Sequence, residues 1–209
     1  NLFSLDGKVA LITGGSRGIG LACARDFLAE GCRVTLVGRD ADRLTQACRQ
    51  LDPSGVQIQG LAANLADAQE AAQAIDRAEA SQGAVDILVN AAGAARQKPF
   101  AQLEPADWRA ALDAKFFTYI NVMDPLVKRM ACRGRGAVVN IVGMGGKLPI
   151  TTHLAGGAAN AALMLASAGL AMAYAHQGVR VNALNPSKTA TERLQHGLEA
   201  TARQEDISQ

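Results

Sequence analysis

Short apolar runs alternate along the chain with segments whose apolar residues recur every three or four positions. The runs are rich in β-branched residues and predict buried strands at 8–13, 33–37, 56–61, 86–90, 137–142 and 179–184. The periodic segments predict helices at 21–31, 40–51, 67–82, 105–132 and 152–176. Strands that alternate with helices of this length indicate parallel βαβ units. We therefore predict an α/β fold, with a doubly wound parallel β-sheet flanked by helices on both faces, as one domain over 1–209.

Two of the predicted helices have unusual features. Pro125 lies inside the 105–132 segment, where the missing N–H should kink or split the helix. The stretch 148–179 contains no Asp, Glu, Lys or Arg and is long enough to span a bilayer. It is rich in alanine and also holds His153, Asn160 and His176, so a buried helix in a subunit interface explains it better than a membrane span.

A glycine-rich turn follows the first predicted strand directly. It reads Thr13-Gly14-Gly15-Ser16-Arg17-Gly18-Ile19-Gly20 and leads into a helix. A strand, a glycine turn and a helix N-terminus together let backbone N–H groups face a pyrophosphate. Glycine is needed where a side chain would block the phosphate or strain the turn. The alternative is a glycine turn with a structural role only.

Composition excludes several classes of protein. The net charge of +2, with scattered Lys and Arg, lacks the basic patch of a nucleic-acid-binding protein. The four cysteines have neither paired nor metal-like spacing, so we expect free thiols, no metal site and a reducing, cytoplasmic location. We also expect no signal peptide before the first strand.

In its glycine turn and later motifs, nearly the whole chain resembles the short-chain dehydrogenase/reductase family. The later motifs are Asn90-Ala91-Ala92-Gly93 after the fourth strand and Pro186-Ser187-Lys188-Thr189-Ala190-Thr191 after the sixth. The resemblance implies a Rossmann-type sheet and hydride transfer between a nicotinamide cofactor and a carbonyl or alcohol. It also implies cofactor contacts at Gly14, Ser16, Arg17, Gly18, Ile19, Gly20, Arg39, Asn64, Leu65, Asn90, Ala92, Gly93, Pro186, Thr189 and Thr191.

Cofactor choice depends on the residues after the second strand, where the adenosine ribose lies in this fold. A carboxylate there would repel a 2′-phosphate, but the position holds Gly38, followed by Arg39, and Arg17 lies in the glycine turn. Guanidinium groups bind phosphate because their planar fork is bidentate and permanently charged. The similarity to family members with this pattern therefore implies NADP(H) in preference to NAD(H), moderated by the adjacent Asp40. The alternative for Arg39 is a solvated charge at a strand end.

The family's catalytic residues have no match in this chain. The resemblance puts the family's Ser position at Gly143, its Tyr position at Gly156 and its Lys position at Asn160, while Lys115 stands where the family has an Asn that anchors a water. Neither Tyr119 nor Tyr174 has a lysine four residues later, so no displaced tyrosine restores the site.

Two functions from different classes remain open. In the first, the chain is an oxidoreductase in which Lys115 stabilises an oxyanion, His153 acts as general acid and Asn160 donates a hydrogen bond. Lys115 as a helix-surface charge and His153 as an ordinary loop residue are the alternatives. In the second, the chain binds NADP(H) without turnover, as a sensor, scaffold or partner subunit. A structural module without nucleotide is a third possibility.

The resemblance also carries expectations about partners and extent. We expect a small carbonyl or alcohol substrate, no nucleic acid, no membrane, and a homodimer or homotetramer formed through the helices at 105–132 and 152–176. The family's substrate-covering helix and seventh strand have no counterpart in these 209 residues.

Overall fold

A computed structural model describes residues 4–93, 97–187 and 189–190. Six strands form one sheet in the order β3-β2-β1-β4-β5-β6, and every neighbouring pair is parallel. The strands are β1 (Val9–Thr13), β2 (Arg33–Gly38), β3 (Ile58–Ala62), β4 (Ile87–Asn90), β5 (Gly136–Ile141) and β6 (Val179–Leu184). All six predicted strands are therefore present, with bounds within two residues of those expected from the sequence.

Helices connect the strands as the alternation predicted. The main helices are α1 (Gly18–Ala29), α2 (Ala41–Leu51), α3 (Ala68–Gln82), α4 (Pro105–Ala111), α5 (Thr118–Cys132) and α6 (Leu154–Tyr174). Shorter turns are η1 (Phe100–Gln102), the π-helical η2 (Leu112–Phe117), η3 (Met144–Gly146) and η4 (Ala175–Gln177). This Rossmann-type architecture confirms the predicted fold class.

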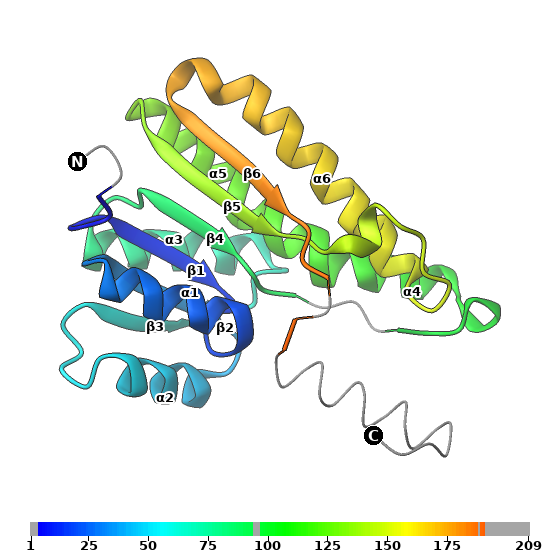
Figure 1. Ribbon diagram of the computed structural model, residues 1–209, viewed down its shortest axis with the longest axis horizontal. Helices are drawn as coiled ribbons and strands as arrows, with labels where there is room; N and C mark the ends of the chain where they lie inside the picture. Colours follow the sequence, from blue (N-terminus) through cyan, green and yellow to red (C-terminus); the bar gives the residue numbers. More distant parts are fainter. Residues whose placement is uncertain (1–3, 94–96, 188, 191–209) are drawn as a thin grey trace.

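Helices pack on both faces of the sheet (Figure 1). On one face, α3 and α5, with part of α6, pack against apolar side chains of β1, β2, β4, β5 and β6. On the other face, α1 and α2 pack against β1, β2 and β3. All five residues of β1 are buried, as expected for a central strand of a parallel sheet. On β6 the outward-facing Arg180, Asn182 and Leu184 are exposed, so the helical cover of the second face is thinner there.

Local sequence explains where several helices begin. The Asp40 carboxylate accepts a hydrogen bond from the Arg43 backbone N–H and caps α2, as predicted. Asp67 caps α3 in the same way. Helix α4 starts with a capping box formed by Glu104 and Asp107, with Pro105 in its first turn.

The predicted helix at 105–132 is divided in the structure, but not at Pro125. Helix α5 continues through Pro125 as one element. The regular α-helix is instead interrupted at η2, where the Thr118 hydroxyl donates to the carbonyl of Asp113, five residues earlier. Such π-helical turns are frequent at functional sites. The break therefore falls next to Lys115 and not at the proline.

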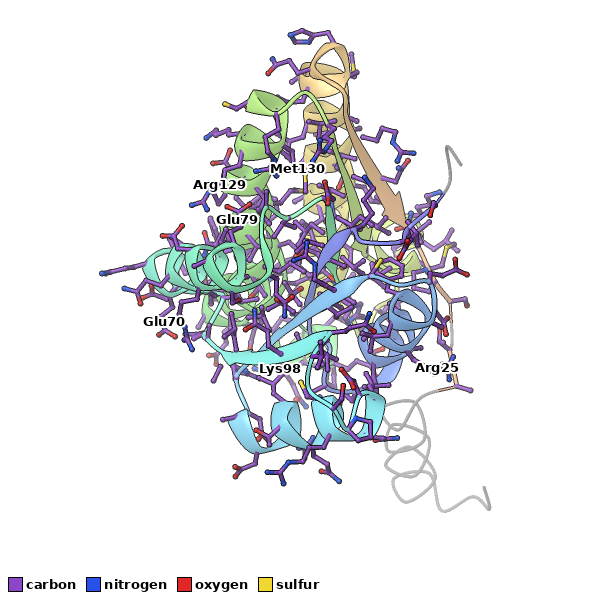
Figure 2. All side chains as sticks on the ribbon, turned by 90° about the vertical axis from the view of Figure 1, so that its left-hand side faces the viewer. Arg25, Glu70, Glu79, Lys98, Arg129 and Met130 are labelled. Atoms are coloured by element: carbon purple, nitrogen blue, oxygen red, sulfur yellow. The ribbon has the colours of Figure 1, made fainter. Side chains whose placement is uncertain are left out.

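An ion-pair cluster joins α3 to α5 (Figure 2). The Arg129 guanidinium lies 2.6 Å from the Asp76 carboxylate and 2.7 Å from that of Glu79. Arg133 approaches Glu79 at 3.4 Å and donates to the carbonyl of Val85 at 2.7 Å. These contacts fix the two helices at the amino end of the sheet, away from the strand ends where ligands bind in this fold.

The charge-free segment forms α6 and the turn after it. By length and composition alone, Leu154–Gln177 is apolar enough to cross a membrane, with a mean hydropathy of 1.4. In the structure 39% of the tested window is buried inside the protein. Core helices of soluble proteins pass the same test, so this feature is weak evidence for a membrane span.

Candidate functional site

The glycine turn packs tightly against the loop that follows β4. Gly14 has a φ of +67°, and a Cβ atom there would lie 2.7 Å from the backbone of Ala92. At Gly20 a Cβ atom would lie 2.5 Å from the Gly14 carbonyl oxygen. A side chain at either position would push the turn away from its neighbours. The backbone thus meets the geometric requirement for a close approach to phosphate.

Helix α1 begins directly after this turn. Arg17 is its N-cap, with an extended backbone, and the Arg17 side chain makes no capping hydrogen bond. Ser16, Gly18 and Ile19 lie at this helix start and line the cleft beside it, and the cofactor contacts predicted for them stay predictions. The N–H groups of the first turn and the positive end of the helix dipole therefore point to the edge where an anion can bind.

A buried chain of hydrogen bonds crosses the carboxyl ends of three strands below the turn. The Thr13 hydroxyl donates to Asn90 Oδ1 at 3.2 Å, and Asn90 Nδ2 donates to Asn140 Oδ1 at 3.0 Å. Asn140 Nδ2 then donates to the Ser167 hydroxyl at 2.9 Å, and that hydroxyl donates to the Leu163 carbonyl at 2.6 Å. All four polar side chains are buried. This chain ties β1, β4 and β5 to α6.

The network changes the role predicted for Asn90 and adds two residues. Because the Asn90 side chain is buried and bonded on both sides, it holds the sheet edge, and the cofactor contact predicted at Asn90 stays a prediction for its backbone. Sequence reasoning missed Asn140 and Ser167. A polar residue inside the apolar run Val138-Val139-Asn140-Ile141 was the available signal.

Two of the predicted adenosine-side residues line a small cleft after β2 and β3. This cleft, of about 410 Å³, is lined by Arg39, Ala62, Ala63, Asn64 and Glu70. The Asn64 backbone N–H donates to the Glu70 carboxylate at 2.8 Å. A cation, an amide and a carboxylate thus meet beside the expected adenosine position.

Leu65 does not belong to this cleft. Its side chain is buried in the hydrophobic core, and its carbonyl accepts a hydrogen bond from Asn121 at 3.0 Å. The side chain of Leu65 thus packs in the core, and the cofactor contact predicted at this residue stays a prediction for its backbone.

Arg17 lines a different and larger cleft. This cleft, of about 630 Å³, lies between α1 and α2, and Thr189 also borders it. Arg39 does not line it, so the two arginines predicted to bind the same phosphate face neighbouring spaces. Neither Arg17 nor Arg39 forms an ion pair with any of the residues that the structure describes.

The described residues after β6 lie at the same edge of the sheet, at the carboxyl ends of the strands. The Pro186 carbonyl accepts from the Met144 backbone N–H at 3.2 Å, and Thr189 donates to the Ser187 carbonyl at 3.2 Å. Asn185 Oδ1 is buried and accepts no hydrogen bond from any described residue. The predicted contact at Thr191 lies outside the described residues.

Lys115 is buried and not a helix-surface charge. Its side chain extends from η2 to the end of β5, where Nζ donates to Tyr119 Oη at 2.7 Å and to the Ile141 carbonyl at 2.8 Å. Tyr119 Oη donates to the same carbonyl at 2.6 Å, and the ammonium lies 4.4 Å from the tyrosine ring centroid. Burial raises the pKa of the Tyr119 phenol far above its usual range. Tyr119 therefore stays protonated and acts as a hydrogen-bonding partner of Lys115.

The other predicted catalytic positions gather around a glycine turn after β5. Gly143 has a φ of +118°, and a Cβ atom there would lie 3.4 Å from Asn160 Nδ2. A Cβ atom on Gly145 would lie 3.1 Å from the His153 ring and 3.7 Å from the same amide. Asn160 and Gly156 are buried on α6, and Nδ1 of His153 is buried at the helix start. The structure thus brings Gly143, His153 and Asn160 together.

The turn also stays close to α6. A Cβ atom on Gly157 would lie 2.7 Å from the Gly145 carbonyl oxygen. Gly93, predicted as a cofactor contact, packs in turn against the backbone of Ala114 and Lys115. The end of β4, the Lys115 turn and the start of α6 therefore meet at one edge of the sheet.

Metal and thiol chemistry find little support here. No group of three His, Cys, Asp or Glu residues in the described part of the chain is placed to hold a metal ion. All four cysteines are free thiols. Burial raises the thiol pKa of Cys23, Cys32 and Cys48, which makes them poor nucleophiles.

Comparison with known proteins agrees with the geometry. The family model described as short chain dehydrogenase matches residues 8–201. A D-threitol dehydrogenase from Mycolicibacterium smegmatis is 35% identical over 190 residues, which cover 91% of this chain and 73% of that protein.

Solved structures superpose closely on this fold. L-sorbose reductase from Gluconobacter frateurii, in complex with NADPH and L-sorbose, has a TM-score of 0.88 at 31% identity and covers 95% of this chain and 76% of that chain. An actinorhodin polyketide ketoreductase with NADPH has a TM-score of 0.90 at 28% identity, over 96% of this chain and 78% of that chain.

Proposed function

The chain belongs to the short-chain dehydrogenase family, and from this premise we propose that it is an NADP(H)-dependent oxidoreductase with an altered proton-handling site. Its reaction interconverts a carbonyl and an alcohol. The bound cofactor supplies or accepts the hydride. The chain's own residues must hold the cofactor, orient the substrate and stabilise the negative charge that develops on the substrate oxygen.

The glycine turn and its surroundings support nucleotide binding. Gly14 and Gly20 leave room only for backbone, and α1 presents its N-terminus there. Both structural neighbours described above were solved with NADPH. Arg17 and Arg39 favour a 2′-phosphate, hence NADP(H) over NAD(H).

The altered site is proposed from the residues at the family's catalytic positions. Gly143, Gly156 and Asn160 offer no hydroxyl, phenol or ammonium group there. The observation that carries the proposal is the Lys115 ammonium, buried at the end of β5 beside the turn that leads to Gly143. We propose that Lys115 stabilises negative charge on the substrate oxygen, that Asn160 donates a hydrogen bond and that His153 supplies the proton.

The names of two relatives support a proposal for the substrate class. One is a dehydrogenase of the polyol D-threitol, and another is a reductase of the ketose L-sorbose. We therefore propose a polyhydroxylated alcohol or its keto form. Polyols, ketoses and their keto acids should be screened first.

A second candidate is NADP(H) binding without turnover. It is favoured by one observation: Tyr119 Oη and the Ile141 carbonyl already accept hydrogen bonds from Lys115. In this case Lys115 is a structural cation, and the chain acts as a sensor or partner subunit.

Turnover of the wild-type protein and a Lys115→Met variant separates the two candidates. We expect the wild type to oxidise NADPH with at least one ketose. We expect Lys115→Met to lose about 100-fold in kcat, the scale of a placed acid or electrostatic group, while the Kd for NADPH stays within about twofold. Lys128→Met is the matched control, because Lys128 lies exposed on α5 and pairs only with Asp124 among the described residues. An unimpaired kcat in Lys115→Met contradicts the role of Lys115, and a wild type that binds NADPH without turning over any substrate supports the second candidate.

We also propose that the chain is a homodimer or homotetramer formed through α5 and α6. Leu165 and Met172, seven residues apart on α6, are exposed by 77% and 82% and would be covered in such an interface. Light scattering of the wild type and of a Leu165→Glu variant tests this proposal. A monomeric wild type contradicts it.

A further inference from the structure

Two glycines of the turn after β5 leave space on either side of one amide nitrogen. A Cβ atom on Gly143 would lie 3.4 Å from Asn160 Nδ2, and no other described atom outside its chain neighbours lies within 4 Å. A Cβ atom on Gly145 would lie 3.7 Å from the same nitrogen and 3.7 Å from Nε2 of His153. Both glycines are half-buried, so these two positions, the Gly143 space and the Gly145 space, are open to a ligand.

The Asn160 side chain is held over this turn by close packing of the turn on α6 (Figure 1). A Cβ atom on Gly146 would lie 2.9 Å from Asn160 Cβ. Asn160 is only 5% exposed, and its amide forms no hydrogen bond with any other residue that the structure describes. A largely buried polar group without a protein partner is unfavourable, and a ligand oxygen would supply the missing hydrogen bond.

The two spaces differ in their second polar neighbour. The Gly143 space follows the end of β5, where the Lys115 ammonium donates to the Ile141 carbonyl at 2.8 Å, and His153 lies more than 4 Å from it. The Gly145 space borders the His153 imidazole, which exchanges protons near neutral pH. An oxygen that develops negative charge therefore fits the Gly143 space, and a hydroxyl group, which both donates and accepts, fits the Gly145 space.

We propose that the chain selects hydroxy ketones, with the reacting carbonyl oxygen in the Gly143 space and a hydroxyl group one or two carbons away in the Gly145 space. The inference rests on the proposed oxidoreductase function and names its substrate class and the residue, Gly145, that admits the hydroxyl. The two N–H groups of Asn160 serve both oxygens. Because both spaces lie within 4 Å of one nitrogen, the two oxygens belong to one short segment of the substrate.

The hydroxyl group gives His153 a path to the reacting oxygen. When the carbonyl carbon has received the hydride, its oxygen is an alkoxide that Lys115 and Asn160 stabilise. The neighbouring hydroxyl donates its proton to this alkoxide and receives one from the protonated Nε2 of His153. The hydroxyl is thereby restored, the imidazole is left neutral and the product is a diol. A ketone without the hydroxyl lacks this path, because His153 does not reach the Gly143 space.

Two matched pairs of ketones test the proposal: hydroxyacetone against butanone, and 4-hydroxybutan-2-one against pentan-2-one. Within each pair a hydroxyl replaces a methyl group and the rest of the molecule is the same. Both kcat and KM are measured with NADPH for the wild type, Gly145→Ala, His153→Phe and Lys147→Ala. Lys147 is the matched control, because it is exposed and lies at the end of the same turn.

In at least one pair, we expect the wild type to reduce the hydroxy ketone with a kcat about 100-fold above that of its partner, the scale of a positioned proton donor. Gly145 has no positive φ, so alanine suits its backbone, and the new Cβ would fill the Gly145 space 3.1 Å from the His153 ring. The ratio of the two kcat values should fall below about threefold in Gly145→Ala and at least about tenfold in His153→Phe. It should be unchanged in Lys147→Ala. The Kd for NADPH should stay within about twofold in every variant, which shows that each one folds.

The outcomes separate this inference from the proposed function. If the wild type reduces both members of each pair equally well, or if Gly145→Ala or His153→Phe keeps the wild-type ratio, the inference fails and the proposed oxidoreductase function stands. If the wild type reduces none of the four ketones, the proposed function fails for this class. The Kd of the NADP⁺-saturated protein for each pair, measured by NMR titration, then decides the inference. A hydroxy ketone bound at least about tenfold more tightly than its partner supports the two spaces, and equal Kd values overturn them.

Discussion

Replacement of Lys115 by Met should leave the protein as stable as the wild type, although the side chain is buried. Lys115 is only 8% exposed, so its ammonium has lost most of its hydration in the folded state. The Ile141 carbonyl keeps a donor in the variant, because Tyr119 Oη bonds to it at 2.6 Å. Met has a similar length and no charge to bury. We therefore expect the free energy of unfolding to fall by less than about 1 kcal/mol or to rise, as when buried ions are exchanged for apolar groups.

Tyr119→Phe should be the more damaging change, although it removes one oxygen atom only. The phenol is fully buried, donates to the Ile141 carbonyl and accepts from the Lys115 ammonium. Phe leaves a buried cation short of an acceptor, and hydrogen bonds to charged groups are worth about 1.5–3 kcal/mol. We expect a loss of stability of that size.

Urea unfolding followed by circular dichroism measures both variants, provided that the m-value is unchanged. Lys128→Met controls for loss of a lysine at an exposed position and should stay within about 0.5 kcal/mol of the wild type. If Lys115→Met proves less stable than Tyr119→Phe, Lys115 is a structural cation. Burial of Lys115 then serves the stability of the fold and not the site.

Three further predictions concern the sheet edge and its hydrogen bonds. Gly14→Ala should lower the free energy of unfolding by more than about 2 kcal/mol and weaken NADPH binding at least tenfold, because φ is +67° and the new Cβ would lie 2.7 Å from the backbone of Ala92. Urea unfolding and fluorescence titrations measure the two effects. A variant that binds NADPH like the wild type contradicts the prediction. Ser167→Ala should lower the free energy of unfolding by about 1–3 kcal/mol, because it leaves Asn140 Nδ2 without its acceptor. Ser167→Thr keeps the hydroxyl and should lose less stability. Equal losses in the two variants would refute the role of the hydroxyl. Because burial raises the pKa of Tyr119, only the unfolded chain releases the phenol proton near pH 10. The difference in unfolding free energy between wild type and Tyr119→Phe should therefore be constant up to about pH 10 and then shift against the wild type by about 1.4 kcal/mol per pH unit. Unfolding experiments on both proteins between pH 9 and 11 measure this difference, in which the contributions of the other titrating groups cancel.

The sequence by itself determined the order and type of the elements. Each strand is a short apolar run with a turn or helix cap on either side. The hydrophobic pattern and these flanking residues were therefore sufficient to predict all six strands. The glycine turn was equally readable, because Gly14 and Gly20 occupy places where only a backbone fits. Such features depend on residues that are neighbours in the chain, so the sequence alone is enough to predict them.

Tertiary structure alone decided which side chains reach the site. Leu65 and Asn90 lie in motifs that suggest ligand contacts, yet packing turns the first into the core and uses the second in a buried network. Lys115 could have been a surface charge, and only the fold brings it to Tyr119 and Ile141. These contacts join residues from different elements, some far apart in the chain, so no pattern along one segment could reveal them.

Tertiary structure also decided which arginine side chains line which cleft. Arg39 stands out in the sequence because it follows a strand end, whereas Arg43 is one more charged residue of an amphipathic helix. Only the packing of α1 beside α2 places Arg43 in the cleft of Arg17. Periodicity predicts that a helix exists and which face is polar, but the neighbour of that polar face depends on how the whole sheet is covered.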